Sequence, residues 1–151
     1  DLIAAILREA EGPAEERLAE AEVAELAATA GAILTGSGIP EMTDPSALLE
    51  VEVTGAVAEL GGRILHGTID RLIVGPERVL AIDYKSNATV PATPGEVPEG
   101  ILRQMGAYAA LLAQIYPGRR IETAVLWTKT GQLMPLPPEM VRHALAATPI
   151  P

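Results

Sequence analysis

The chain has 151 residues, which fits a single domain, and 48% of them are hydrophobic, enough to build a core. It has no cysteine, which excludes disulfides, thiolate zinc sites and an iron–sulfur cluster. No apolar run approaches the roughly 18 residues of a membrane span, so we expect no membrane partner and no signal peptide.

The formal net charge of −9 is unevenly distributed. Residues 1–52 carry 12 acidic and 2 basic residues, whereas residues 53–151 carry 8 acidic and 9 basic ones. Such a chain does not attract nucleic acid by its global field. Either its partner is not a polyanion, or metal ions and neighbouring domains supply positive charge. Because Asp1 opens inside a helical run without an initiator Met, we expect a piece of a longer protein.

The first third of the chain is predicted to be helical. Residues 2–10 read as a helix that Gly12-Pro13 ends, and a second helix runs from there to about Leu34. The turn-rich residues 35–46 connect it to the remainder. We therefore expect residues 1–47 to form an N-terminal helical segment.

The remainder alternates between strand and helix patterns. Strands are predicted at 48–53 (extended by 56–60), 63–74 and 78–84, and a mobile proline-rich loop at 86–98 follows them. A helix is predicted at 99–115, a strand at 121–128, a short strand at 133–136 and a last helix after Pro137-Pro138. The first three strands form a meander. This order predicts an α/β (α+β) layout around one sheet, with residues 48–151 as the core.

Three charged residues stand at the ends of paired strands. Asp70 lies late in the second strand, and Asp83 and Lys85 lie at the end of the third. Residues two apart on a strand share a face, and the short turn between these strands brings Asp70 beside Asp83. Two carboxylates form a hard-oxygen site for Mg²⁺, and a lysine beside them can position a phosphate or a water molecule. Hydrolysis of a phosphodiester needs these elements.

The next helix carries polar residues at helical spacing. Gln104 and Tyr108 are four apart on an otherwise apolar helix and therefore share a face. They are predicted to reach back to the metal site or to hold a phosphate, and Arg103 beside them adds positive charge. A helix-edge glutamine and a tyrosine at the rim of the core are the structural alternative.

The runs GTIDRLIV, VLAIDYKSN and RQMGAY together resemble the RecB-like branch of the PD-(D/E)XK nuclease superfamily. With EVEV before them, and YPGRRIETAVLWT and LMPLPP after them, the likeness is greatest to the nuclease domains of the AddA family of helicase–nuclease subunits. The resemblance spans about residues 48–140. It implies a restriction-endonuclease-like core, a central mixed sheet flanked by helices.

The resemblance also implies roles for individual residues. Asp70 and Asp83 would be metal ligands, the backbone carbonyl of Tyr84 a further ligand, and Lys85 the residue that activates water. Gln104 and Tyr108 match the QxxxY motif of the family. Glu52 stands in the preceding strand where such domains often carry an acidic residue. The family usually adds a histidine ligand from an early helix, which we expect upstream of Asp1.

The implied cofactor is Mg²⁺, or Mn²⁺ in its place. The implied partners are single-stranded DNA ends, helicase domains of the same parent chain and an AddB-like subunit, in the bacterial cytoplasm. The sequence has no phosphate-cradling glycine loop, so ATP would bind only in the parent helicase.

Two other functions stay open. A non-catalytic relative would keep the fold as a docking or DNA-guiding module, although such domains usually lose the acidic residues or the lysine. A stand-alone restriction-type endonuclease is disfavoured by the acidic charge. Three other notable residues are predicted to be structural: His66 lies about 13 Å along the strand from Asp70, His143 is expected at the surface, and Trp127 is expected in the core.

Overall fold

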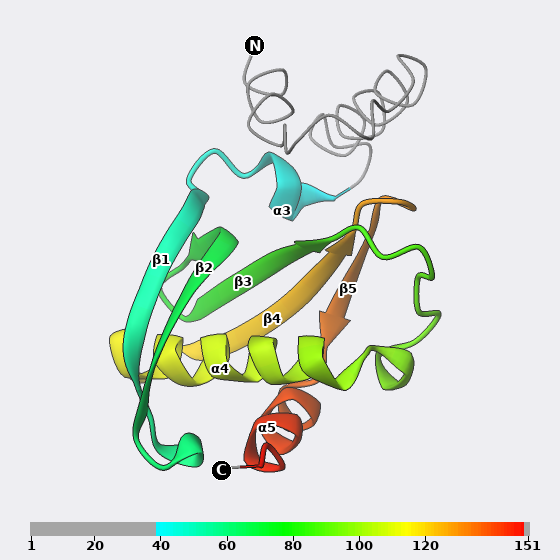
Figure 1. Ribbon diagram of the computed structural model, residues 1–151. Helices are drawn as coiled ribbons and strands as arrows, with labels where there is room; N and C mark the ends of the chain where they lie inside the picture. Colours follow the sequence, from blue (N-terminus) through cyan, green and yellow to red (C-terminus); the bar gives the residue numbers. More distant parts are fainter. Residues whose placement is uncertain (1–38, 150–151) are drawn as a thin grey trace, which may run out of the picture.

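A computed structural model describes residues 39–149, which form a mixed sheet covered by helices (Figure 1). The five strands lie in the order β1-β2-β3-β4-β5. Their bounds are β1 (Leu48–Val57), β2 (Arg63–Val74), β3 (Arg78–Lys85), β4 (Arg120–Trp127) and β5 (Gln132–Leu136). The helices predicted at 2–10 and 13–34 lie outside the described residues.

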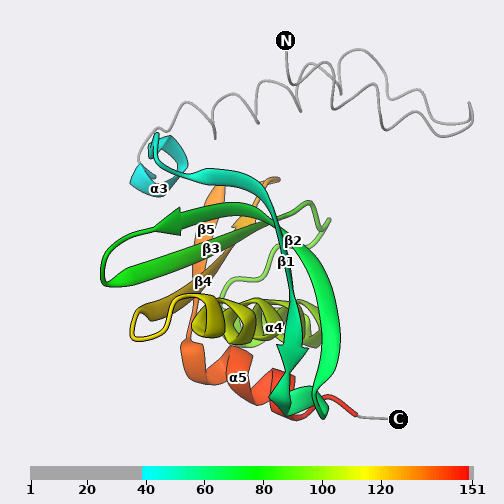
Figure 2. The same cartoon turned by 90° about the vertical axis from the view of Figure 1, so that its left-hand side faces the viewer.

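The helices are α3 (Pro40–Thr43), α4 (Glu99–Ile115) and α5 (Pro138–Ala146), with short 3₁₀ turns at η1 (Ala58–Leu60) and η2 (Pro94–Glu96). The long α4 lies across one face of the sheet and α5 packs against α4, whereas α3 lies beside the opposite face (Figures 1 and 2). None of the helices within residues 39–149 is long and apolar enough to cross a membrane.

One pair of strands is parallel. β3 pairs with β4 in parallel, and α4 makes the crossover that this connection needs, while all other neighbours are antiparallel. Both strands are almost continuously buried because helices and loops cover both of their faces. The expected central mixed sheet flanked by helices is confirmed.

The core divides at the sheet. The larger part fills the space between the sheet and the helices α4 and α5, and includes Met105, Leu112 and Trp127. The smaller part lies on the other face, where Met42 of α3 covers Ile82. The burial of Trp127 confirms its prediction as a core residue.

The β2 strand has two parts with different neighbours. Its ladder with β1 continues to the Val57–Arg63 pair, but its ladder with β3 ends at the Arg71–Ile82 pair. Beyond that point β1 and β2 run on together, away from β3 (Figure 1). Opposite the branch point, Glu50 in β1 has a φ of 51°, a left-handed conformation that interrupts the regular strand. The sheet therefore forks between β2 and β3.

The predicted elements differ from the observed ones at a few ends. The second strand and the long helix have the predicted bounds, and the first strand reaches Val57. Residues 58–60 form a 3₁₀ turn instead of extending that strand, and the turn-rich connection contains α3. Short Pro-containing helices of this kind have no periodicity by which to predict them.

Candidate active site

The fork between β2 and β3 is where the predicted acidic pair lies. Asp70 and Asp83 would form the next rung after the Arg71–Ile82 pair, but the ladder has ended. Instead, the Tyr84 backbone N–H donates to Asp70 Oδ2 at 2.6 Å. The Asp70 side chain thus accepts a hydrogen bond from β3 where backbone pairing with β2 has stopped. This bond fixes the Asp70 carboxylate inside the fork.

Asp83 is buried in the fork beside a lysine. It is 3% exposed, and its Oδ2 lies 2.7 Å from Lys85 Nζ. Burial raises the pKa of the Asp83 carboxyl, and the charge of Asp70 adds to this effect while Lys85 opposes it. Although Oδ2 is in this ion pair, no donor makes a well-directed hydrogen bond to it. A buried carboxylate oxygen thus remains under-coordinated.

A chain of hydrogen bonds links the lysine to α4 and back to β2. Lys85 Nζ donates to Gln104 Oε1 at 2.9 Å, and Gln104 Nε2 donates to the Tyr108 hydroxyl at 2.9 Å. That hydroxyl donates in turn to the backbone carbonyl of Thr68 at 2.9 Å. Burial raises the pKa of Tyr108, so its hydroxyl stays protonated and able to donate. The structure therefore brings the predicted helix pair to the lysine.

Two participants were missed by sequence reasoning. The Thr68 carbonyl is available because β2 has no neighbour on that edge. Gly67 lets the tyrosine approach, since a Cβ there would lie 2.6 Å from Tyr108 Cε1. A glycine within a strand often marks such a close approach, so Gly67 was the signal that could have revealed it.

The remaining predicted site residues lie around this group. The Tyr84 side chain is on the other face, where burial raises its pKa, and its carbonyl remains a predicted ligand only. Arg103 pairs with Glu99 on its own helix at 2.5 Å. Glu52 is exposed and lies opposite Thr68 in the β1–β2 register. The neighbouring charges that shift the pKa of Asp83 are those of Lys85 and Asp70, and Glu52 is not among them.

The two histidines lie apart from the acidic pair. His66 is exposed, and its Nδ1 lies 2.9 Å from Thr54 Oγ1. His143 is exposed on α5. Both positions agree with the structural interpretation of these residues.

The acidic pair fits a divalent metal ion. Mg²⁺ usually keeps several water molecules and is held by only one or two carboxylates, and Asp83 Oδ2 is a buried oxygen whose ion pair with Lys85 is not a well-directed hydrogen bond. Within residues 39–149 no group of three or more His, Cys, Asp or Glu side chains gathers at one place. The residues present therefore suit Mg²⁺ with its waters, and the histidine ligand that the resemblance implies upstream of Asp1 stays a prediction.

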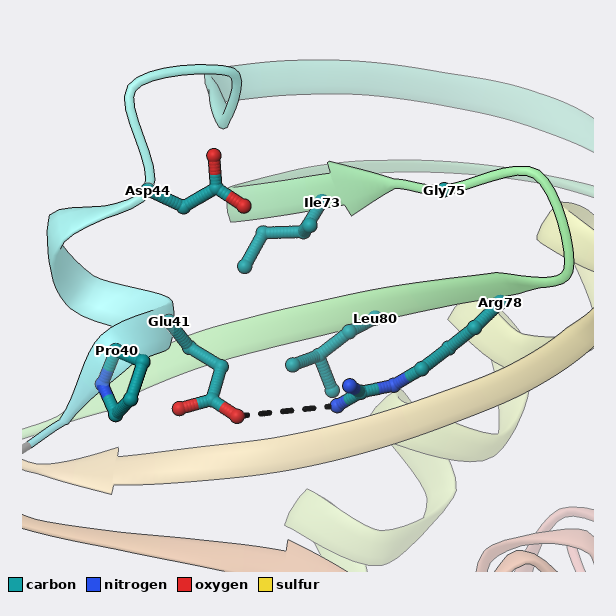
Figure 3. Close-up of a pocket in the computed structure, with 7 residues that line it drawn as sticks. All are labelled: Pro40, Glu41, Asp44, Ile73, Gly75, Arg78 and Leu80. Carbon is teal, nitrogen blue, oxygen red and sulfur yellow. Dashed lines mark ion pairs between the residues drawn. The ribbon is translucent and has the colours of Figure 1, made fainter.

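A cavity of about 280 Å³ lies on the face of the sheet opposite α4, between α3 and the β2–β3 turn (Figure 3). Its lining residues are Pro40, Glu41, Asp44, Ile73, Gly75, Arg78 and Leu80. Glu41 and Arg78 form an ion pair across it at 4.0 Å. Glu41 lies close to Arg78 and Asp44 lies close to Arg71. This cavity therefore lacks the surplus of carboxylates found in the fork.

A mixed sheet crossed by a helix, with carboxylates and a lysine at a strand fork, is the α/β arrangement that the sequence predicted for a nuclease domain. Comparison with known families agrees: the sequence model of the PD-(D/E)XK nuclease superfamily matches residues 2–145. The chain belongs to the PD-(D/E)XK nuclease superfamily, whose members are generally nucleases. No curated protein matches the chain.

Proposed function

We propose that this domain is a metal-dependent DNA nuclease that hydrolyses phosphodiester bonds. The observation that carries the proposal is the fork, where two carboxylates converge beside one lysine. Asp70 and Asp83 would hold Mg²⁺, or Mn²⁺, which would polarise the scissile phosphate and lower the pKa of a water molecule. Membership of the superfamily supports the same reaction.

Each residue of the fork has its own role in the proposed reaction. Lys85 Nζ, held between Asp83 and Gln104, would orient the attacking water and place a positive charge beside the phosphate. Gln104 and Tyr108 fix that ammonium group through the bond to β2. Because Asp70 is itself held by a backbone N–H, its carboxylate needs little rearrangement to bind a cation.

We further propose that the domain works as the exonuclease of an AddA-type helicase–nuclease in double-strand-break repair and recombination. The resemblance of the three motif runs supports this, and so does the net charge of −9. A domain that repels DNA suits an arrangement in which a motor delivers single-stranded ends. ATP would be used by the helicase domains of the parent, an AddB-like subunit would be the partner, and the compartment would be the bacterial cytoplasm.

The test is cleavage of end-labelled single-stranded DNA with Mg²⁺ or Mn²⁺, beside an Asp83→Ala variant and an EDTA control. Cutting that disappears in both controls is the expected result. In the helicase-containing parent, Asp83→Ala should leave ATP-driven unwinding intact, because the fork lies in the nuclease domain.

An absence of cutting needs one further comparison. The assay is then repeated with about 30 additional upstream residues, the length of a helix with its connections, because the resemblance implies a histidine ligand on such a helix. If the longer chain is also inactive, the domain is a non-catalytic docking or DNA-guiding module and the proposal is wrong.

A further inference from the structure

A cavity of about 270 Å³ lies between α4, α5 and the first half of β4. On α4 it is lined by residues such as Gly106 and Ala113. At 100° per residue these lie on the opposite side of the helix from Gln104 and Tyr108, which reach the fork. The cavity is therefore separate from the candidate active site.

The way in which α5 packs against α4 creates this cavity (Figure 1). The two helices are in close contact at Gly106, where a Cβ would lie 2.3 Å from the Val141 carbonyl oxygen. Helices that cross at an angle diverge away from their point of contact. The neighbouring α4 residues that line the cavity are Ala109, Ala110 and Ala113. Their methyl groups are too short to fill the space that the diverging helices leave.

Thr123 of β4 brings an unused polar group to this cavity. It is 3% exposed, and because it lies two residues before Val125 it shares the sheet face that packs against α4. Its Oγ1 is buried and has no hydrogen-bond partner within residues 39–149. Rotation about χ1 exchanges the hydroxyl and methyl groups of a threonine with little change in volume, so the hydroxyl can turn toward a ligand. An unsatisfied buried hydroxyl costs free energy, which a bonded ligand group would recover.

The size and the charge of the cavity restrict what can occupy it. Cofactors and drug-sized ligands fill about 300–1,000 Å³, whereas benzene fits a cavity of about 150 Å³. A volume of about 270 Å³ therefore suits a single aromatic ring that carries a polar group. The two charged lining residues, Glu59 and Arg142, are exposed and of opposite sign. The cavity therefore favours a neutral group over an ion.

We propose that this cavity is a docking pocket for a tyrosine side chain of a partner protein domain. The ring would pack between the alanines of α4 and the aliphatic side chains of Val141 and Leu145, and the phenol hydroxyl would bond the Thr123 hydroxyl. A buried tyrosine hydroxyl usually has a hydrogen-bond partner, and tyrosine is enriched among the residues that anchor protein interfaces. The inference is independent of the proposed nuclease function, because the residues of the fork do not line this pocket.

The test is titration of the full chain with p-cresol, the analogue of the tyrosine side chain, and with toluene, which lacks the hydroxyl, followed by NMR chemical shifts. The Kd of p-cresol should be about millimolar, as expected for a ligand of so few atoms. The ratio of the toluene Kd to the p-cresol Kd should be about three to ten times larger in the wild type than in Thr123→Val, the coupling of one hydrogen bond. Thr54→Val, at an exposed position of β1, should keep the wild-type ratio. Equal ratios in the wild type and Thr123→Val would overturn the proposal.

A second variant keeps the test decisive if Thr123→Val does not fold. Ala109→Met adds a flexible side chain to the pocket lining, and Ala146→Met makes the same change at an exposed position of α5. The first should abolish binding of both compounds, and the second should bind them like the wild type. Circular dichroism and melting temperature establish that each variant is folded. Unchanged binding by folded Ala109→Met would place the compounds elsewhere and overturn the proposal.

A third compound distinguishes a docking pocket from a site for a free small molecule. N-acetyltyrosinamide carries the same ring on a peptide backbone, and it should bind at least as tightly as p-cresol because the rim of the pocket is exposed. Binding of p-cresol without binding of N-acetyltyrosinamide would mean that the pocket takes only free small molecules, and the docking proposal is wrong. If none of the three compounds binds, the cavity holds water only and the proposal is likewise wrong.

Discussion

The two ends of β3 carry two ionic clusters of opposite character. At the start of the strand, Glu122 accepts hydrogen bonds from Arg78 and Arg120, each at 2.6 Å, and Arg78 also reaches Glu41 (Figure 3). Burial would raise the pKa of Glu122, but the bonds from the two arginines outweigh it and lower that pKa. We call this group the arginine cluster.

At the other end of β3, the fork holds Asp70 and Asp83 with Lys85 as the one cation among them. Here burial wins, and the pKa of Asp83 is raised. Both clusters have perturbed carboxyl groups, so perturbation alone does not distinguish a site from a structural network. The balance of charge does distinguish them: the charges of the arginine cluster cancel, whereas the carboxylates of the fork outnumber its one lysine, and this surplus of negative charge attracts a divalent cation.

The largest expected effect is that of Asp83→Asn. Cleavage should fall about 10³-fold or more, because a bound metal contributes several kcal/mol to transition-state stabilisation and each 1.36 kcal/mol is tenfold in rate. Without metal, the free energy of unfolding near pH 7 should not fall. The folded pKa of Asp83 lies above its unfolded value, so stability is lost as the pH rises and the buried charge forms, and asparagine avoids that charge.

The measurement for Asp83→Asn pairs an oligonucleotide cleavage assay with a metal-free denaturant melt. The matched variant in the arginine cluster is Glu122→Gln, which should cut DNA at the wild-type rate. A large loss of stability in Asp83→Asn would show that the Asp83–Lys85 pair is structural and would remove the contrast between the clusters.

Lys85→Met should lower the cleavage rate about 10²-fold or more, the usual contribution of a positioned group that handles a proton. Its ammonium group connects Asp83 to Gln104, and methionine keeps the length of the chain without the charge. The control is Lys129→Met, because Lys129 is exposed and its ammonium group donates to the Ala88 carbonyl, away from the fork. Equal rates for the two variants would exclude Lys85 from the reaction.

Tyr108→Phe should lower kcat about tenfold and leave KM nearly unchanged. The hydroxyl fixes Gln104, which in turn holds Lys85, and small displacements of positioning groups affect the chemical step more than binding. Losing the donor to the Thr68 carbonyl should also cost about 1 kcal/mol of stability. Tyr116→Phe, at the end of the same helix, is the control, and a change in stability without a change in kcat would make Tyr108 purely structural.

The smallest effect is expected in the arginine cluster. The folded pKa of Glu122 lies below its usual value of 4.5, so its contribution to stability is present above that pH and is lost as the pH falls further. Glu122→Gln should therefore flatten the acid side of the stability profile. At pH 7 it should cost at most about 1 kcal/mol, because the pair is partly exposed. Denaturant melts from pH 3 to 7 measure this, and an unchanged profile would contradict the pairing.

Much of the sheet was predictable because glycine and proline residues mark the ends of its strands and helices. Gly75-Pro76 separates β2 from β3, and Pro98 and Pro117-Gly118 bound α4, so these boundaries have local chemical causes. The adjacency of Asp70 and Asp83 followed from the short turn alone. Their roles in catalysis remain predictions.

The fork itself was not predictable from local patterns. No residue pattern around Asp70 indicates that the backbone pairing between β2 and β3 stops there. The end of this pairing depends on where α4 and β4 place β3. Arg71 was overlooked for the same reason. It is 7% exposed and donates to the carbonyls of Glu41 and Asp44, a burial that only long-range contacts with the α3 segment create.

Trp127, the one tryptophan of the chain, stands directly opposite Lys85 in the β3–β4 register and is fully buried. Its indole N–H has no hydrogen-bond partner among the described residues. The domain thus contains an intrinsic fluorophore one strand away from the lysine of the fork. Its emission offers a label-free optical readout of cation or strand binding at that site, against a background of three tyrosines.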